Sequence, residues 1–227
     1  MSAWYIFIRV LPLLAYVMVP LRSFAMEGFW TRFTTGNSGL ESNSISIVTV
    51  DENNVKWIAY ADTPGKITRY DEYAWKTYSA ADGLPDGKVT SIAALKGAVW
   101  AIADSRLCRL RDERWEIFFP YQPRYFSTGM AAADPSENLW VSGKLSEKDQ
   151  NTISRFDGVS WVTWPIAGPV GALSFDRDGG LWASRFGECL LHFDGVRWQR
   201  FTHERLRWVL SVATDAGGTV WVAGETG

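Results

Sequence analysis

The sequence has few of the features on which enzyme active sites and nucleic-acid surfaces are usually built. Only two histidines occur in 227 residues, His192 and His203, so neither an HExxH nor a His-x-His metal pair exists. A Gly-x-Ser-x-Gly elbow and a glycine-rich phosphate loop are also missing. The 23 basic and 25 acidic residues nearly balance, and basic runs are absent. We therefore predict no catalytic residue, no metal ligand, no cofactor and no nucleic-acid partner.

The amino terminus is poor in charge. Residues Trp4–Leu21 carry a single charge, Arg9, and Val10–Leu21 is an apolar run of signal-peptide length. Ser23 and Ala25 then supply the small residues of a cleavage site, with no cysteine nearby for lipid attachment. This pattern predicts an export signal over residues 1–25, or alternatively an uncleaved N-terminal membrane anchor. The mature domain would then span residues 26–227 in the periplasm or outside the cell.

Tryptophan is abundant and regularly spaced. Five Trp residues open an aromatic pair, namely Trp30/Phe33, Trp75/Tyr78, Trp115/Phe118, Trp161/Trp164 and Trp198/Phe201. A second set comprises Trp57, Trp100, Trp140, Trp182 and Trp221, with successive separations of 43, 40, 42 and 39 residues. A period of about 40 residues is typical of propellers and solenoids.

Four short segments recur within each period, and none shows a helical pattern. An apolar strand ends near an Asp, a turn rich in Gly, Asp and Asn follows, and three further strands complete the unit. The second strand carries one Trp and the fourth carries the Trp-x-x-aromatic pair, so both sets are expected to be buried between stacked sheets. The prediction is an all-β fold, a β-propeller of about five four-stranded blades.

The fifth repeat is incomplete in the sequence. The chain reaches Gly227 just after the second strand of that repeat, while the strand expected at Trp30 has no blade of its own. Two arrangements fit: the N-terminal strand closes the ring by joining the last blade, or the chain is a fragment of a larger propeller.

The repeat resembles the two-component regulator propeller family. The resemblance rests on Asp82-Gly83-Leu84, on the run Asp176–Trp182 and on Arg155-Phe156-Asp157-Gly158, and it extends from Phe29 to the end of the chain. It implies a periplasmic sensor propeller of a bacterial regulatory system, several of which detect oligosaccharides. Two departures are visible: Leu95 replaces the Asp after the first strand of repeat two, and residues 121–126 replace the Asp-Gly-Leu loop in repeat three.

Several other residues are expected to be structural. Arg69, Arg109, Arg155 and His192 share one position in the third strands, where pairing with acids or packing over aromatic rings of the next blade is favoured over an inward ring of cations. The sequence Asp176-x-Asp178-Gly179 is interpreted as a turn rather than a calcium loop. Cys108 and Cys189, two repeats apart, are expected to be small buried side chains and not a disulfide.

One Trp of residues 26–227, Trp208, has no equivalent Trp in the other repeats. Trp208 aligns with Ser44, Lys88, Ser127 and Pro169, the residues just before the first strands, at the expected mouth of the central channel. Its neighbours include cations, and the corresponding loop of repeat three is rich in aromatics. The predicted ligand-binding residues of this rim are Trp208, His203, Arg205, Arg207, Tyr121, Arg124 and Tyr125. Packing within the loops is the structural alternative for all of them.

The leading hypothesis is an exported, non-catalytic sensor that binds a small molecule or oligosaccharide, or a protein partner. The alternatives are an enzyme of the propeller-lyase type, with His203 as the candidate at the channel mouth, and a scaffold for protein assembly. Contact with a membrane is expected only through the N-terminal anchor or a further downstream segment.

Overall fold

The computed structural model describes residues 31–95, 97–118, 129–144, 150–203 and 208–224. The chain divides into two units, Met1–Arg32 and Phe33–Gly227, and every described strand belongs to the second. Within the described ranges, no helix is long and apolar enough to cross a membrane. The predicted export signal, residues 1–25, lies outside the described residues and stays a prediction.

In the described ranges, eighteen strands form five antiparallel sheets. The first sheet contains β1 (Ile45–Val50), β2 (Lys56–Tyr60), β3 (Ile67–Tyr70) and β4 (Trp75–Tyr78). The second contains β5 (Val89–Leu95), β6 (Ala98–Ala103), β7 (Arg106–Arg111) and β8 (Arg114–Ile117). The third contains β9 (Ala131–Ala133), β10 (Leu139–Lys144), β11 (Asn151–Phe156) and β12 (Trp161–Ile166). The fourth contains β13 (Val170–Phe175), β14 (Leu181–Arg185), β15 (Cys189–Phe193) and β16 (Trp198–Phe201), and the fifth contains β17 (Val209–Thr214) and β18 (Val220–Gly224).

Each sheet is a meander in which neighbours along the chain are neighbours in the sheet. Tight turns make this order possible, because the residues between strands accept left-handed backbone, as Asn54, Glu137 and Gly179 do. The one helical element in the described part of the chain is a short 3-10 helix, η2 (Ala80–Asp82), which leads from the first sheet to the second. The all-β prediction is therefore confirmed.

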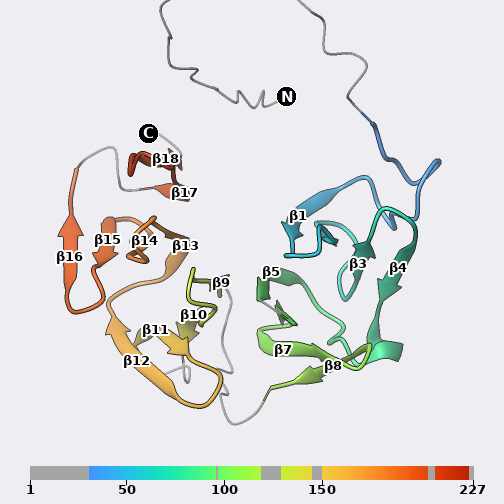
Figure 1. Ribbon diagram of the computed structural model, residues 1–227, viewed down its shortest axis with the longest axis horizontal. Helices are drawn as coiled ribbons and strands as arrows, with labels where there is room; N and C mark the ends of the chain where they lie inside the picture. Colours follow the sequence, from blue (N-terminus) through green and yellow to red (C-terminus); the bar gives the residue numbers. More distant parts are fainter. Residues whose placement is uncertain (1–30, 96, 119–128, 145–149, 204–207, 225–227) are drawn as a thin grey trace, which may run out of the picture. The chain divides into compact units, whose positions relative to one another are not determined.

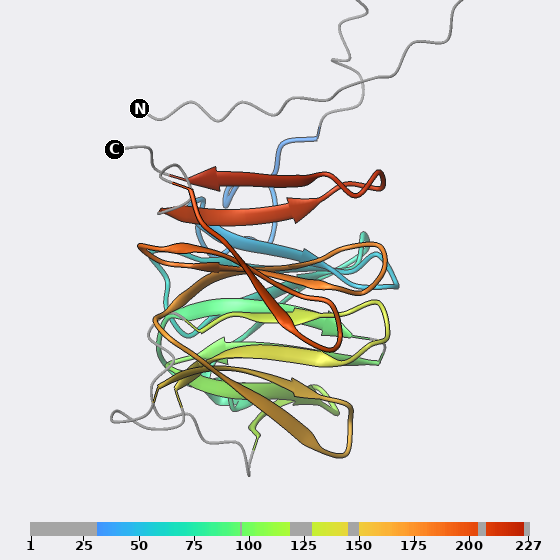
Figure 2. The same ribbon diagram turned by 90° about the vertical axis from the view of Figure 1, so that its left-hand side faces the viewer.

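The sheets follow one another as propeller blades (Figure 1). Their first strands pack side by side, β1 beside β5, β5 beside β9, β9 beside β13 and β13 beside β17, while β4, β8, β12 and β16 lie on the outside. Figure 2 shows the turns between first and second strands on one side of the molecule. We call this side the turn face, and the side on which the first strands begin the rim face.

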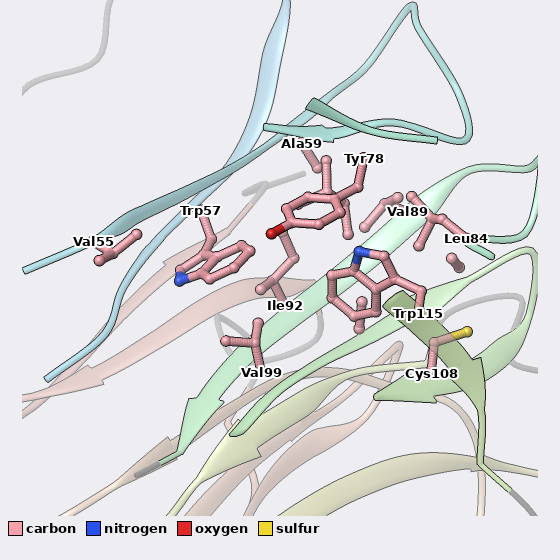
Figure 3. Close-up of a cluster of buried hydrophobic side chains, with 13 residues drawn as sticks. Val55, Trp57, Ala59, Tyr78, Leu84, Val89, Ile92, Val99, Cys108 and Trp115 are labelled. Atoms are coloured by element: carbon pink, nitrogen blue, oxygen red, sulfur yellow. The ribbon is translucent and has the colours of Figure 1, made fainter. Parts of the chain in front are cut away.

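The hydrophobic core lies between the sheets and not within any one of them. One cluster joins Trp57 and Tyr78 of the first sheet to Ile92, Cys108 and Trp115 of the second (Figure 3). Equivalent clusters join the second sheet to the third, the third to the fourth and the fourth to the fifth. A single four-stranded sheet cannot bury both of its faces, so each sheet depends on its neighbours for stability.

Of the nine repeated Trp residues that the structure describes, four are buried as predicted, four are partly buried and one is exposed. Trp57, Trp100, Trp115 and Trp140 are each at most 4% exposed. Trp182 is partly buried against the fifth sheet, together with Val209 and Val212. Trp221 is 53% exposed, which contradicts the prediction for that residue. The reason is that its side of the fifth sheet meets no further sheet among the described residues.

The strand predicted at Trp30/Phe33 is absent from residues 31–33, the part of it that the structure describes. Phe33 lies in no strand, and its ring packs edge-on against Tyr70 and Trp75 of the first sheet, with both centroid distances 5.4 Å. Trp30 itself lies outside the described residues. The fifth sheet has two strands in the described part of the chain. The structure thus contains four four-stranded blades and a smaller fifth sheet.

Candidate functional site

The predicted rim retains one strong feature, an exposed aromatic ring at the start of the fifth sheet. Trp208 immediately precedes β17 and is 53% exposed. Its repeat equivalents Ser44, Lys88 and Pro169 immediately precede β1, β5 and β13, as the alignment predicted. The backbone here is closely packed, since a Cβ added to Gly224 would lie 2.1 Å from the Trp208 carbonyl oxygen. The indole is therefore presented from a fixed position on the rim face.

The rest of the predicted rim is only partly described. His203 follows β16 and is exposed, two residues beyond the exposed ring of Phe201. Five predicted members lie outside the described residues, namely Arg205, Arg207, Tyr121, Arg124 and Tyr125. The structure therefore places His203 at the beginning and Trp208 at the end of one connection, and the grouping of the other five stays a prediction.

The four third-strand side chains lie against acids or aromatic rings. The prediction that the rings belong to the next blade is wrong, because each ring stands on the second strand of the same sheet, directly opposite in the register. Arg69 pairs with Asp71 at 3.2 Å and with Glu113 of the next sheet at 3.6 Å. The guanidinium groups of Arg109 and Arg155 lie over the rings of Trp100 and Trp140, at 5.4 Å and 5.9 Å from the centroids. His192 stacks on Trp182 at 4.3 Å. These cations help to pack the blades and do not form an inward ring.

A carboxylate fixes the turn between the first and second strands in four of the five repeats. In the fourth repeat, Asp176 accepts hydrogen bonds from the backbone N–H groups of Asp178 and Gly180, at 3.1 Å and 2.7 Å. The interpretation of this segment as a turn is thus confirmed. The second carboxylate oxygen accepts the indole N–H of the second-strand Trp in three repeats, by the pairs Asp51–Trp57, Asp134–Trp140 and Asp215–Trp221.

The fourth repeat uses histidine where the others use tryptophan. His192 Nε2 lies 2.9 Å from Asp176 Oδ2, and both side chains are 17% exposed. Burial raises the pKa of Asp176, but the hydrogen bonds from His192 and Gly180 outweigh it and lower that pKa overall. A Cβ at Gly180 would lie 2.5 Å from both interacting atoms. Only glycine fits at this position, because the backbone passes directly over the His192–Asp176 pair. The pair lines neither of the two hollows of the turn face.

Repeat two lacks this carboxylate, and the turn face is hollowed on both sides of it. Two hollows, of about 330 Å³ and 180 Å³, share Leu95, Ala98 and Arg109 in their walls. The larger lies between the first and second sheets, and half of its twelve lining residues are charged. The smaller lies between the second and third sheets and contains aromatic and apolar residues as well. The sequence did give a signal here, the departure at Leu95, but the hollows themselves were not predicted.

The cysteines are structural, as expected. Cys108 and Cys189 are both buried and form no disulfide. Burial raises the pKa of the Cys108 thiol to about 12, which leaves it protonated and unreactive at neutral pH. Among the described residues, no group of three or more His, Cys, Asp or Glu side chains could hold a metal ion.

Comparison with known proteins supports the fold through structure and not through sequence. No family model matches the chain, and no curated protein matches it significantly. Among solved structures, the extracellular domain of the putative hybrid two-component system BT3049 from B. thetaiotaomicron is similar, with TM-score 0.65 and 12% identity over 82% of this chain and 26% of that one. Virginiamycin B lyase from Staphylococcus aureus, solved with quinupristin, gives TM-score 0.62 and 17% identity over 82% of this chain and 65% of the lyase.

The fold is a β-propeller. A third neighbour, YCF48 bound to a D1 peptide, has TM-score 0.56 and 12% identity, over 80% of this chain and 60% of that protein. The chain thus spans less than two thirds of the length of each of these three structures. At such identities the likeness shows the fold alone. Some neighbours are extracellular domains of bacterial sensor systems and others are lyases. The comparisons therefore do not assign this chain to one family.

Proposed function

We propose that this chain is an exported ligand-binding propeller, a sensor or recognition module that makes no covalent bond with its ligand. The observation that carries the proposal is Trp208. Blade packing does not require an aromatic residue there, because the equivalent residues are Ser44, Lys88 and Pro169, yet a half-exposed indole stands on the rim face. Large exposed aromatic rings beside polar donors are typical of ligand and partner contacts.

An oligosaccharide is the ligand class that we propose for this rim. An exposed indole offers a flat apolar face to a sugar ring, and His203 on the same connection adds a polar group. The extracellular sensor domains among the structural neighbours support both the ligand-binding role and a periplasmic or extracellular location. The lyase neighbours keep an enzyme as the second candidate, and a scaffold that binds protein is the third.

The test is a ligand screen followed by substitution of Trp208. A thermal-shift screen of residues 26–227 against oligosaccharides should identify a ligand, whose affinity is then measured by calorimetry. Trp208→Ala should abolish binding and change the melting temperature little, since the ring is half exposed.

Trp221→Ala is the matched control, because Trp221 has the same exposed fraction, 53%, but lies on a sheet face. It should leave binding intact. Unfolding of the Trp208 variant would show that this ring belongs to the core and would refute the rim proposal. Turnover of a bound ligand by the wild-type protein would favour the enzyme instead.

We also propose that the five sheets belong to a larger ring. Ile45, Val48 and Val50 of β1 face away from the second sheet and are 42%, 57% and 53% exposed. Their equivalents in the later sheets, such as Val89, Ile92 and Val212, are buried against the preceding sheet. Trp221 is exposed on the opposite end of the series. Each of these two exposed faces carries apolar residues whose equivalents in the other sheets are covered by a neighbouring blade.

A further inference from the structure

We propose that the smaller hollow of the turn face is a second binding site, which holds a free α-amino acid with its carboxylate on Arg109 and its ammonium group toward Glu137. The site lies between the second and third sheets, away from Trp208, and does not depend on the rim proposal. Its nine lining residues are described in full: Leu95, Ala98, Trp100, Arg109, Glu137, Leu139, Phe156, Asp157 and Gly158.

The hollow exists because the turn of repeat two is short. Leu95 pairs with Ala98 across this hairpin, leaving only residues 96–97 between the two strands. In the first sheet Val50 pairs with Lys56, which leaves the longer stretch 51–55. Repeats three, four and five have the same length as repeat one and the same leading Asp. Repeat two therefore has three fewer residues between these strands than the other repeats and lacks the carboxylate, and the space beside Arg109 is left open.

Arg109 is a cation without a carboxylate partner among the described residues. Its guanidinium makes no hydrogen bond or ion pair there, whereas Arg69, at the same repeat position, has both Asp71 and Glu113. The contact with the Trp100 ring, 5.4 Å from the centroid, holds the guanidinium in place. A guanidinium fixed in this way presents two parallel N–H donors, the geometry that a carboxylate accepts best.

The opposite wall of the hollow is acidic. Glu137 is exposed and stands at a left-handed turn position with φ of 63°, and its carboxylate makes no hydrogen bond to the described residues. Asp157 also lines the hollow, although its oxygens already accept hydrogen bonds from Val159 and Ser160. A simple anion would meet these two carboxylates, and a simple cation would meet Arg109. A dipolar ligand satisfies both walls, because its two charges cancel and each has an opposite partner.

The remaining walls suit a small aliphatic side chain. Trp100, Leu139 and Phe156 supply apolar surface, and the volume of about 180 Å³ limits the ligand to the size of a small amino acid. Burial of such a side chain adds affinity to the two charged contacts.

The experiment is calorimetric titration of residues 26–227 with glycine, alanine and leucine, and with two half-ligands. 4-Methylpentanoate keeps the carboxylate of leucine without the amine, and 3-methylbutylamine keeps the amine without the carboxylate. We expect leucine to bind and each half-ligand to bind at least about tenfold more weakly, since each loses one charged contact. Equal affinity of either half-ligand, or no binding of any of the three amino acids, would overturn the proposal.

Two variants and one matched control locate the site. Arg109→Met and Glu137→Gln should each weaken leucine binding by about tenfold or more. Arg155→Met is the control, because Arg155 occupies the same position over Trp140 but lines neither hollow. Melting curves of all three variants are recorded to check that they are folded. A loss of affinity in the Arg155 variant equal to that in the Arg109 variant would mean that binding occurs elsewhere.

Discussion

At the scale of single residues, the position of a Trp within the repeat decides what that Trp does. Trp140 is 3% exposed, packs parallel to Trp164 at 5.4 Å and donates its N–H to Asp134. Trp221 makes the same hydrogen bond to Asp215 but is half exposed. The sequence context of the two residues is nearly the same, so the difference comes from the neighbouring sheet.

This difference gives a prediction for stability. Trp140→Ala should lower the free energy of unfolding by about 3–5 kcal/mol, because it leaves a cavity between the third and fourth sheets. Trp221→Ala should cost about 1 kcal/mol, the value of one hydrogen bond. Urea denaturation measures both values. Equal losses would show that the fifth sheet is packed as tightly as the inner ones.

At the scale of structural elements, a turn of the second sheet is hydrogen-bonded to a strand of the first. Glu113, in the turn between β7 and β8, accepts hydrogen bonds from Lys76 Nζ at 2.8 Å and from the Tyr78 hydroxyl at 2.6 Å. Both donors belong to β4 of the first sheet. The hydrogen bond from Lys76, followed by that from Tyr78, lowers the pKa of Glu113 below its ordinary value of 4.5. The contact therefore links two blades only while Glu113 is ionised.

The sign of the pH effect follows from this lowered pKa. A carboxyl whose pKa is lower in the folded state stabilises the protein above its ordinary pKa, and that stabilisation is lost as the pH falls through the folded-state pKa. We expect Glu113→Gln to lower the melting temperature at pH 7, and the difference from the wild type to shrink as the pH falls below the ordinary pKa of 4.5. Glu52→Gln, in a neighbouring exposed turn, is the control. A constant difference at all pH values would assign the effect of the Glu113 variant to packing alone.

At the scale of the whole molecule, the first and fifth sheets are the ends of a series of stacked sheets. The inner part of the first sheet has no covering neighbour in the described chain, while its outer part is covered by the preceding segment, where Leu40 packs on Ile58, Tyr60 and Trp75. The proposal of a larger ring states that a further blade would cover the inner part.

A matched pair of substitutions tests this view in the present chain. Val48 and Ile92 occupy the same repeat position, but Val48 is 57% exposed and Ile92 is 5% exposed. Ile92→Ala should cost about 2–5 kcal/mol, and Val48→Ala less than about 1 kcal/mol, as is usual for a surface site. Thermal melting reports both. A large loss for Val48→Ala would mean that β1 is covered in solution by another molecule or by another part of the chain.

The sequence by itself determined the repeat, the strand order within each repeat and the full or partial burial of most of its described Trp residues. It could do so because alternation, turn residues and a 40-residue period are local properties of the chain, as the pairs Asp51–Trp57 and Asp134–Trp140 show. The repeat alignment also predicted contacts of Arg109 and Arg155 with aromatic rings, but it placed those rings in the next blade, and they lie in the same sheet.

Only the tertiary structure decided which positions are covered and which are open. Trp221 and Val48 have buried equivalents, and their exposure depends on whether a sheet stands beside them. The hollow at Arg109 likewise required the short turn of repeat two to meet the third sheet, a contact between residues far apart in sequence. Local patterns carry no information on such absences of a neighbour, because burial is a property of the assembled sheets and not of the segment that is buried.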